Sequence, residues 1–61
     1  MNALPWLLFI VLNGEYEVPT PMRYATYEQC MKDGALLAMT MKVDLQLIRH
    51  VLDPKCVRQP S

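Results

Sequence analysis

Two cysteines and one histidine, at Cys30, His50 and Cys56, are the side chains of this chain best suited to covalent or metal chemistry. Zinc sites need four ligands and usually show short paired spacings, whereas these three residues lie far apart in sequence. A cysteine nucleophile needs a base, an orienting group and donors for an oxyanion, and only one histidine is present. The pattern therefore predicts no metal, no cofactor and no enzymatic activity.

The two cysteines leave two alternatives open. A bond between Cys30 and Cys56 would close a long loop and add roughly 3 kcal/mol to the stability of a small domain. Free cysteines, however, are also common as small apolar side chains in a protein core. The spacing alone does not choose between a disulfide and two buried thiols.

Length and composition bound the class of protein. The 61 residues form a single small α+β domain, residues 1–61, which buries only about 60% of the surface of its unfolded chain. Hydrophobic residues make up 52% of the chain, which argues against disorder. Six basic residues balance six acidic ones without clustering, so we expect no nucleic-acid partner.

The apolar run 6–12 is too short to cross a bilayer, which takes roughly 20 residues, so no stable membrane insertion is expected. No Lys or Arg precedes the run, which argues against a cleaved signal peptide. We therefore expect a cytoplasmic protein, with export as the alternative.

A β-hairpin is predicted at the start of the chain. Run 6–12 is aromatic and β-branched, Asn13-Gly14 favours a two-residue turn, and 15–18 alternates polar and apolar residues. Pro19 and Pro21 should end the ladder or confine this strand to an edge.

A helix should follow the hairpin, because Thr26 to Gln29 fits a capping box and apolar residues then recur at helical spacing. An unbroken helix 27–52 would overhang the sheet, so we expect a break at 42–44. Residues 45–52 would then form a second helical piece or, as the alternative, a strand. With 55–59 as a short final strand or an extended tail, the fold class is ββαβ.

The first strand is apolar on both faces, and one helix can cover only one of them. A two-residue turn would place Leu7, Phe9, Val11, Tyr16 and Val18 on one face. The other face would need residues 45–52, a second copy or another protein to cover it. The predicted interface consists of this other face together with Met39, which lies off the main helix face: Trp6, Leu8, Ile10, Leu12 and Met39. Leu8→Glu or Ile10→Glu should then break association and leave the helix intact.

The layout resembles that of very small ββαβ proteins found in phages, prophages and bacterial genomes. The matching residues are the apolar strand 6–12, the helix start 26–30 with Thr26, Glu28 and Cys30, and the late Cys56. The resemblance implies the ββαβ arrangement and a phage origin, and it carries no function to transfer.

These observations predict a protein-binding module, and the leading hypothesis is a phage-type accessory protein that binds and inhibits or modulates a host protein, as a homodimer. A structural component of a virion or envelope complex is the second hypothesis. A small exported disulfide domain is the third.

Overall fold

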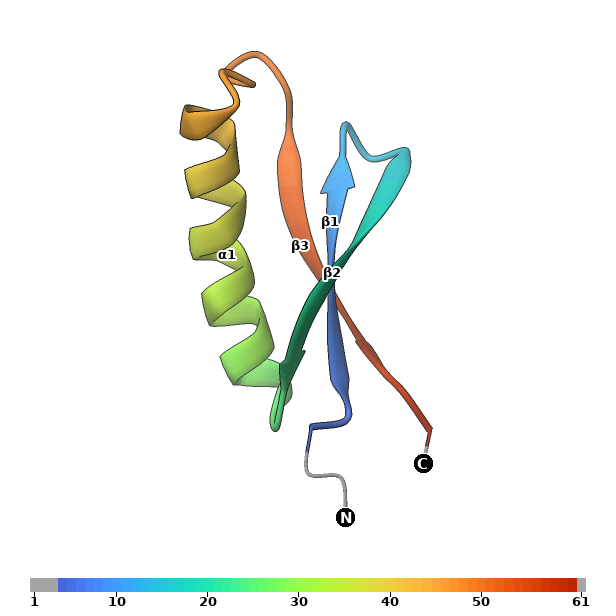
Figure 1. The fold of residues 1–61 in the computed structure, drawn as a ribbon. Coiled ribbons are helices and arrows are strands. Elements are labelled where there is room, and N and C mark those ends of the chain that lie inside the picture. The colour runs from blue at the N-terminus through green and yellow to red at the C-terminus, as the bar shows by residue number, and fades with distance from the viewer. Residues whose placement is uncertain (1–3, 61) are drawn as a thin grey trace.

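The computed structural model describes residues 4–60, and in it a single helix packs on one face of a three-stranded sheet (Figure 1). All strand pairs are antiparallel, and the strand order is β2-β1-β3. The elements in chain order are β1 (Trp6–Leu12), β2 (Tyr16–Tyr24), α1 (Tyr27–Asp44) and β3 (Leu52–Arg58). The predicted ββαβ fold is therefore confirmed, and the most apolar strand, β1, lies in the centre of the sheet.

The register of the hairpin differs from the predicted one. Asn13 and Gly14 both have positive φ, as expected, and the Glu15 amide donates to the Leu12 carbonyl at 3.0 Å. Glu15 is then an extra residue, because the ladder resumes with Leu12 opposite Tyr16. This shift by one residue exchanges the faces of β2, so that Tyr16 lies on the same face as Leu12 instead of the face of Leu7.

Of the two alternatives for Pro19 and Pro21, the structure shows the second: β2 is an edge strand, and the prolines do not end it. Strand β2 continues through Pro19 and Pro21 to Tyr24, with an irregularity where β1 passes from Leu7 to Phe9. In this irregular stretch the Thr20 hydroxyl donates to the Leu8 carbonyl at 2.9 Å, which replaces a missing backbone hydrogen bond. A side chain thus bridges the gap that the prolines open in the ladder.

The helix begins where the capping pattern predicted. The Thr26 hydroxyl accepts a hydrogen bond from the Gln29 amide at 3.1 Å, and Thr26 itself has extended backbone angles. Helix α1 ends at Asp44, close to the break expected at 42–44. Residues 45–51 are turns, so the second helical piece expected at 45–52 was wrong.

Thr26→Ala should lower the free energy of unfolding by about 1 kcal/mol, because an N-terminal amide of the helix loses its acceptor. Thr26→Ser keeps the hydroxyl and serves as the control. Urea melts of the two variants measure the difference, and equal midpoints would mean that the cap contributes nothing.

A polar clamp holds the end of the hairpin against the turns that precede β3. The backbone N–H of Asn13 donates to the Val51 carbonyl at 2.7 Å, and the backbone N–H of Val51 donates to the side-chain oxygen Oδ1 of Asn13 at 2.9 Å. The side-chain nitrogen of Asn13 also lies 3.1 Å from Nδ1 of His50. His50 is therefore part of the connection between hairpin and turn, beyond the end of the helix.

The core lies between α1 and the face of the sheet that carries Leu8 and Ile10. These two side chains are 0% and 1% exposed, and Cys30 of the helix is also fully buried. Trp6 closes one end of this layer by packing against Tyr27, with ring centroids 5.3 Å apart in an edge-to-face arrangement.

The small residues of the helix allow it to lie close to the sheet. Gly34 and Ala38 are buried one turn apart. A Cβ atom on Gly34 would lie 2.6 Å from Cβ of Pro54 and 2.7 Å from a methyl group of Leu8. Glycine at this position is thus required by packing, even though it disfavours the helix.

Gly34→Ala should lower the free energy of unfolding by about 2 kcal/mol, because overpacking outweighs the gain in helix propensity. The neighbouring Ala35 is exposed, so it provides the matched control. Ala35→Gly should lower the free energy of unfolding by about 1 kcal/mol. Alanine is then more stabilising than glycine at position 35 and less stabilising than glycine at position 34. A Gly34→Ala variant more stable than the wild type would contradict the close packing.

Candidate functional site

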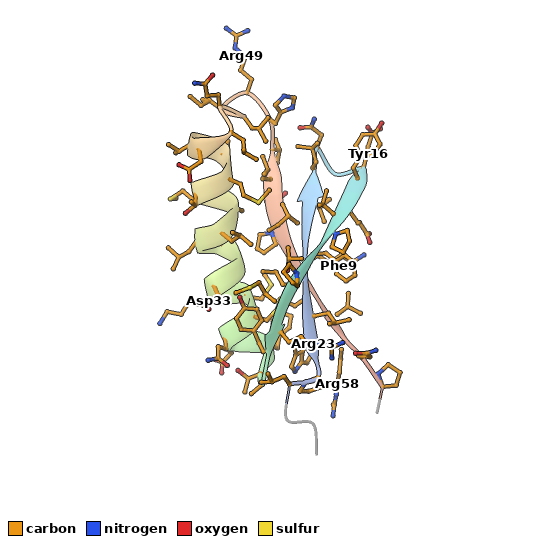
Figure 2. All side chains as sticks on the ribbon, in the orientation of Figure 1. Phe9, Tyr16, Arg23, Asp33, Arg49 and Arg58 are labelled. Atoms are coloured by element: carbon orange, nitrogen blue, oxygen red, sulfur yellow. A yellow bond between two sulfur atoms is a disulfide. The ribbon has the colours of Figure 1, made fainter. Side chains whose placement is uncertain are left out.

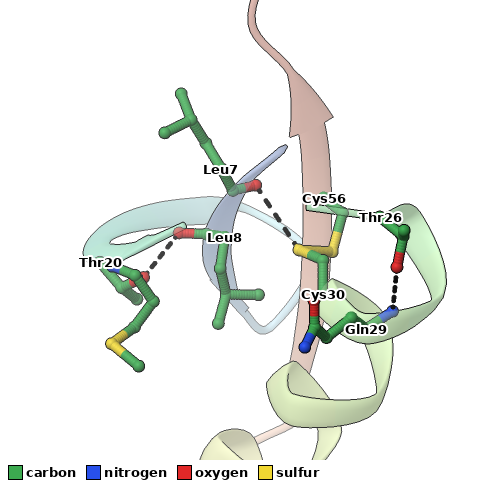
Figure 3. Close-up of a disulfide and its surroundings, with 8 residues drawn as sticks. Leu7, Leu8, Thr20, Thr26, Gln29, Cys30 and Cys56 are labelled. Carbon is green, nitrogen blue, oxygen red and sulfur yellow. Dashed lines mark hydrogen bonds between the residues drawn. A yellow bond between two sulfur atoms is a disulfide. The ribbon is translucent and has the colours of Figure 1, made fainter. Parts of the chain in front are cut away.

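The two cysteines form a disulfide between the helix and the last strand. Cys30 of α1 and Cys56 of β3 are bonded with their Cα atoms 6.2 Å apart, and Figure 3 shows the bond beside Leu8. The Leu7 carbonyl oxygen lies 3.8 Å from Cys30 Sγ, a contact only, because a disulfide sulfur has no proton to donate. The predicted alternative of a disulfide is therefore the one found, and it holds α1 against the sheet.

The other titratable groups do not converge on a reactive centre. Within residues 4–60 no three His, Cys, Asp or Glu side chains are grouped as metal ligands would be. Burial of the Tyr24 phenol, with the Asp33 carboxylate nearby, raises the pKa of Tyr24. A helix long and apolar enough to span a bilayer is also absent from the described part of the chain.

A shallow groove of about 250 Å³ lies between α1 and β3. Its lining is mainly apolar, with Met39 and Pro54 among its walls, and its charged groups are Lys42 and Asp53. One cation and one carboxylate at an open groove provide neither an activated nucleophile nor a ligand cluster.

The predicted interface is largely wrong, because α1 covers that face of the sheet. Leu8 and Ile10 are fully buried in the core, and Trp6 and Leu12 are half-buried at its margins. Met39 is 67% exposed, so it is the one predicted interface residue with a largely free side chain. The physical reason is that the small helix residues and Cys30 face the side of β1 that carries Leu8.

The opposite face of the sheet, here called the open sheet face, is not covered by α1. On the side of α1, Tyr16 and Val18 of β2 are also exposed, at 63% and 44%. The centre of the open sheet face is formed by Leu7, Phe9 and Val11 of β1, which alternate with the core residues and are each half-buried. Val57 of β3, opposite Leu7, extends this apolar centre. Figure 2 shows Phe9 on the side of the sheet away from α1.

Charged side chains surround the apolar centre of the open sheet face. Glu17 of β2 and Asp53 of β3 lie on either side of Val11, and Lys55 of β3 lies opposite Phe9. The side chains of Lys55 and Glu17 meet across β1 with 2.6 Å between Lys55 Nζ and Glu17 Oε2, and both remain about half exposed. Arg23, opposite Leu7, is exposed at the other end of the face.

A second apolar surface lies on the helix, on the side opposite the core. This outer helix stripe consists of Leu36, Met39 and Val43, which are 61%, 67% and 66% exposed. Their spacing of three and four residues aligns them along two turns of α1. The side chains of this stripe are more exposed than those at the centre of the open sheet face, but none of them is aromatic.

Comparisons with protein-family models, with curated proteins and with solved structures found no match to this chain.

Proposed function

We propose that this chain is a non-enzymatic protein-binding domain that acts through the open sheet face. The supporting observation is that Leu7, Phe9 and Val11 lie on a sheet face on which no element of residues 4–60 forms a second layer. Sheets normally bury an apolar face against another element. A partner surface would supply the missing layer.

The distribution of side chains on the open sheet face fits this role. Protein interfaces combine an apolar, aromatic centre with a polar rim. Phe9 lies at the centre of the apolar residues, and Glu17, Lys55 and Arg23 surround them. The outer helix stripe has no aromatic residue, which favours the sheet as the main binding surface.

Site-specific photo-crosslinking in the cells that make the protein tests this proposal. A benzophenone amino acid at Phe9 should give a crosslinked protein adduct, whereas the same group at Met39, exposed on the other side of the molecule, should give much less. Adducts formed only from position 39 would move the binding surface to the helix. No adduct from either position would overturn the proposal.

Two forms of this function follow from the hypotheses drawn from the sequence. An accessory protein that modulates a host protein should be soluble when purified alone, whereas a component of a larger assembly should aggregate without its neighbours. Light scattering on the isolated protein distinguishes them. The mainly charged rim of the open sheet face favours the soluble form.

A second candidate function, a small exported domain, is favoured by the disulfide. Structural disulfides persist mainly in oxidising compartments, and small exported domains rely on them because their cores are small. Alkylation of unfolded protein taken directly from cells should then leave Cys30 and Cys56 unmodified, with a mass about two units below that of the reduced chain. Full alkylation of both cysteines would place the protein in a reducing compartment.

A further inference from the structure

We infer that the occupant of the open sheet face is a second copy of this chain, which docks by the same face to form a symmetric dimer. This inference rests on the proposed function and names its partner. In this dimer the two sheets pack face to face with Phe9 of each copy near the two-fold axis. Leu7 of one copy then lies over Val11 of the other.

Association through the outer edge of β3 is disfavoured by the position of a proline. The Asn13 amide donates to the Val51 carbonyl at 2.7 Å, and the Gln59 amide donates to the Pro5 carbonyl at 2.8 Å. Because backbone groups alternate in direction along a strand, every second residue of β3, including Pro54, directs its backbone away from β1. Pro54 has no N–H, so this edge cannot form a continuous ladder with another strand.

The outer edge of β2 is interrupted in the same way. The Leu8 carbonyl faces β2, where it accepts a hydrogen bond from the Thr20 hydroxyl. Ile10, two residues further along β1, therefore also directs its backbone toward β2, and its partner there is Val18. The next residue, Pro19, therefore directs its backbone toward the outer edge. Prolines at the two edges leave the open sheet face as the unprotected surface of the sheet.

Glu17 and Arg23 of the open sheet face are self-complementary, while Asp53 of β3, which also lies opposite Val11, would face Val57 of the second copy. Glu17 lies beside Val11, and Arg23 lies beside Leu7. Both charges are on β2, and along the strand direction Phe9 lies between their two levels. A two-fold axis through Phe9, running across the strands, exchanges these two levels. It brings Glu17 of each copy to Arg23 of the other, which gives two attractive pairs.

This symmetry would place Lys55 of one copy near Lys55 of the other copy. The ammonium group of each Lys55 reaches across β1 to Glu17, 2.6 Å from Oε2, which directs it away from the other Lys55. The second carboxylate oxygen of Glu17 remains for Arg23 of the second copy. The intramolecular ion pair therefore supports the dimer contact.

The size of the sheet predicts a weak dimer. The sheet has strands of seven, nine and seven residues, and its three-stranded part covers about 14 by 23 Å. Stable specific interfaces bury about 800 Å² of accessible surface on each partner, roughly one sixth of the 4721 Å² surface of this chain. A flat contact of this size falls below that value, so we expect dimer formation to depend on concentration in the micromolar range or above.

Sedimentation equilibrium on Glu17→Arg, Arg23→Glu and their equimolar mixture tests the inference. The wild type should dimerise reversibly, and each variant alone should dissociate at least about tenfold more readily, because two attractive pairs become repulsive. In the mixture, both contacts are attractive again, since one copy carries two arginines and the other two glutamates. The mixture should therefore form a heterodimer at least about tenfold more tightly than either variant self-associates, although more weakly than the wild type, because the Glu17→Arg copy has lost the partner of Lys55.

Leu36→Glu on the outer helix stripe is the control and should not change the dimer constant, while circular dichroism verifies that every variant is folded. A wild type that remains monomeric at 1 mM, or a mixture that does not recover, would overturn the inference. If Phe9 nevertheless crosslinks to a different protein, the proposed function survives with another partner. Absence of both the dimer and the adduct would overturn the two together.

Discussion

Reduction of the Cys30–Cys56 bond is expected to lower the free energy of unfolding by about 3.5 kcal/mol. The two cysteines are separated by 26 residues, and the chain-entropy model assigns about this value to a loop of that length. A single core in a domain of this size rarely supplies more than about 3–5 kcal/mol. The reduced chain should therefore be close to unfolding at physiological temperature.

Thermal melts with and without a non-thiol reductant measure this effect. The Cys30→Ala/Cys56→Ala double variant should melt like the reduced wild type, and the reductant should not change its melting temperature. A reduced wild type that melts at the same temperature as the oxidised protein would contradict the prediction.

Leu8→Ala should destabilise the fold by about 3–4 kcal/mol, because it removes a fully buried side chain from the centre of the core. Leu8 contacts the helix at Gly34, so the lost methyl groups leave a cavity at the helix–sheet junction. Leu8→Glu would bury an unpaired charge and should prevent folding. This replaces the expectation from the sequence that Leu8→Glu breaks only an interface.

Leu36 provides the matched control for Leu8. The two residues are of the same type, but Leu36 is 61% exposed on the outer side of α1. Leu36→Ala and Leu36→Glu should change the free energy of unfolding by less than about 0.5 kcal/mol. Urea denaturation monitored by helix signal compares the two positions, and a folded Leu8→Glu variant would show that this face is not the core.

The local elements could be predicted from the sequence because each has a short-range signal. Thr26 determines where the helix begins, and the positive φ at Asn13 and Gly14 determines where the chain reverses.

The side of the sheet that the helix covers could not be predicted in the same way. Strand β1 is apolar on both faces, so alternation does not distinguish Leu8 from Phe9. The extra residue at Glu15 is a property of the folded hairpin, and it moves Tyr16 and every later residue of the regular ladder to the other face. The candidate site on the open sheet face depends on both features.

The turn between α1 and β3 has a consequence for protease digestion. Arg49 is exposed there and projects away from the body of the molecule (Figure 2). A single tryptic cut after Arg49 would divide the protein into two peptides, with Cys30 in the first and Cys56 in the second. The sulfur–sulfur bond would keep the pieces together, so the nick should become visible on a gel only after reduction.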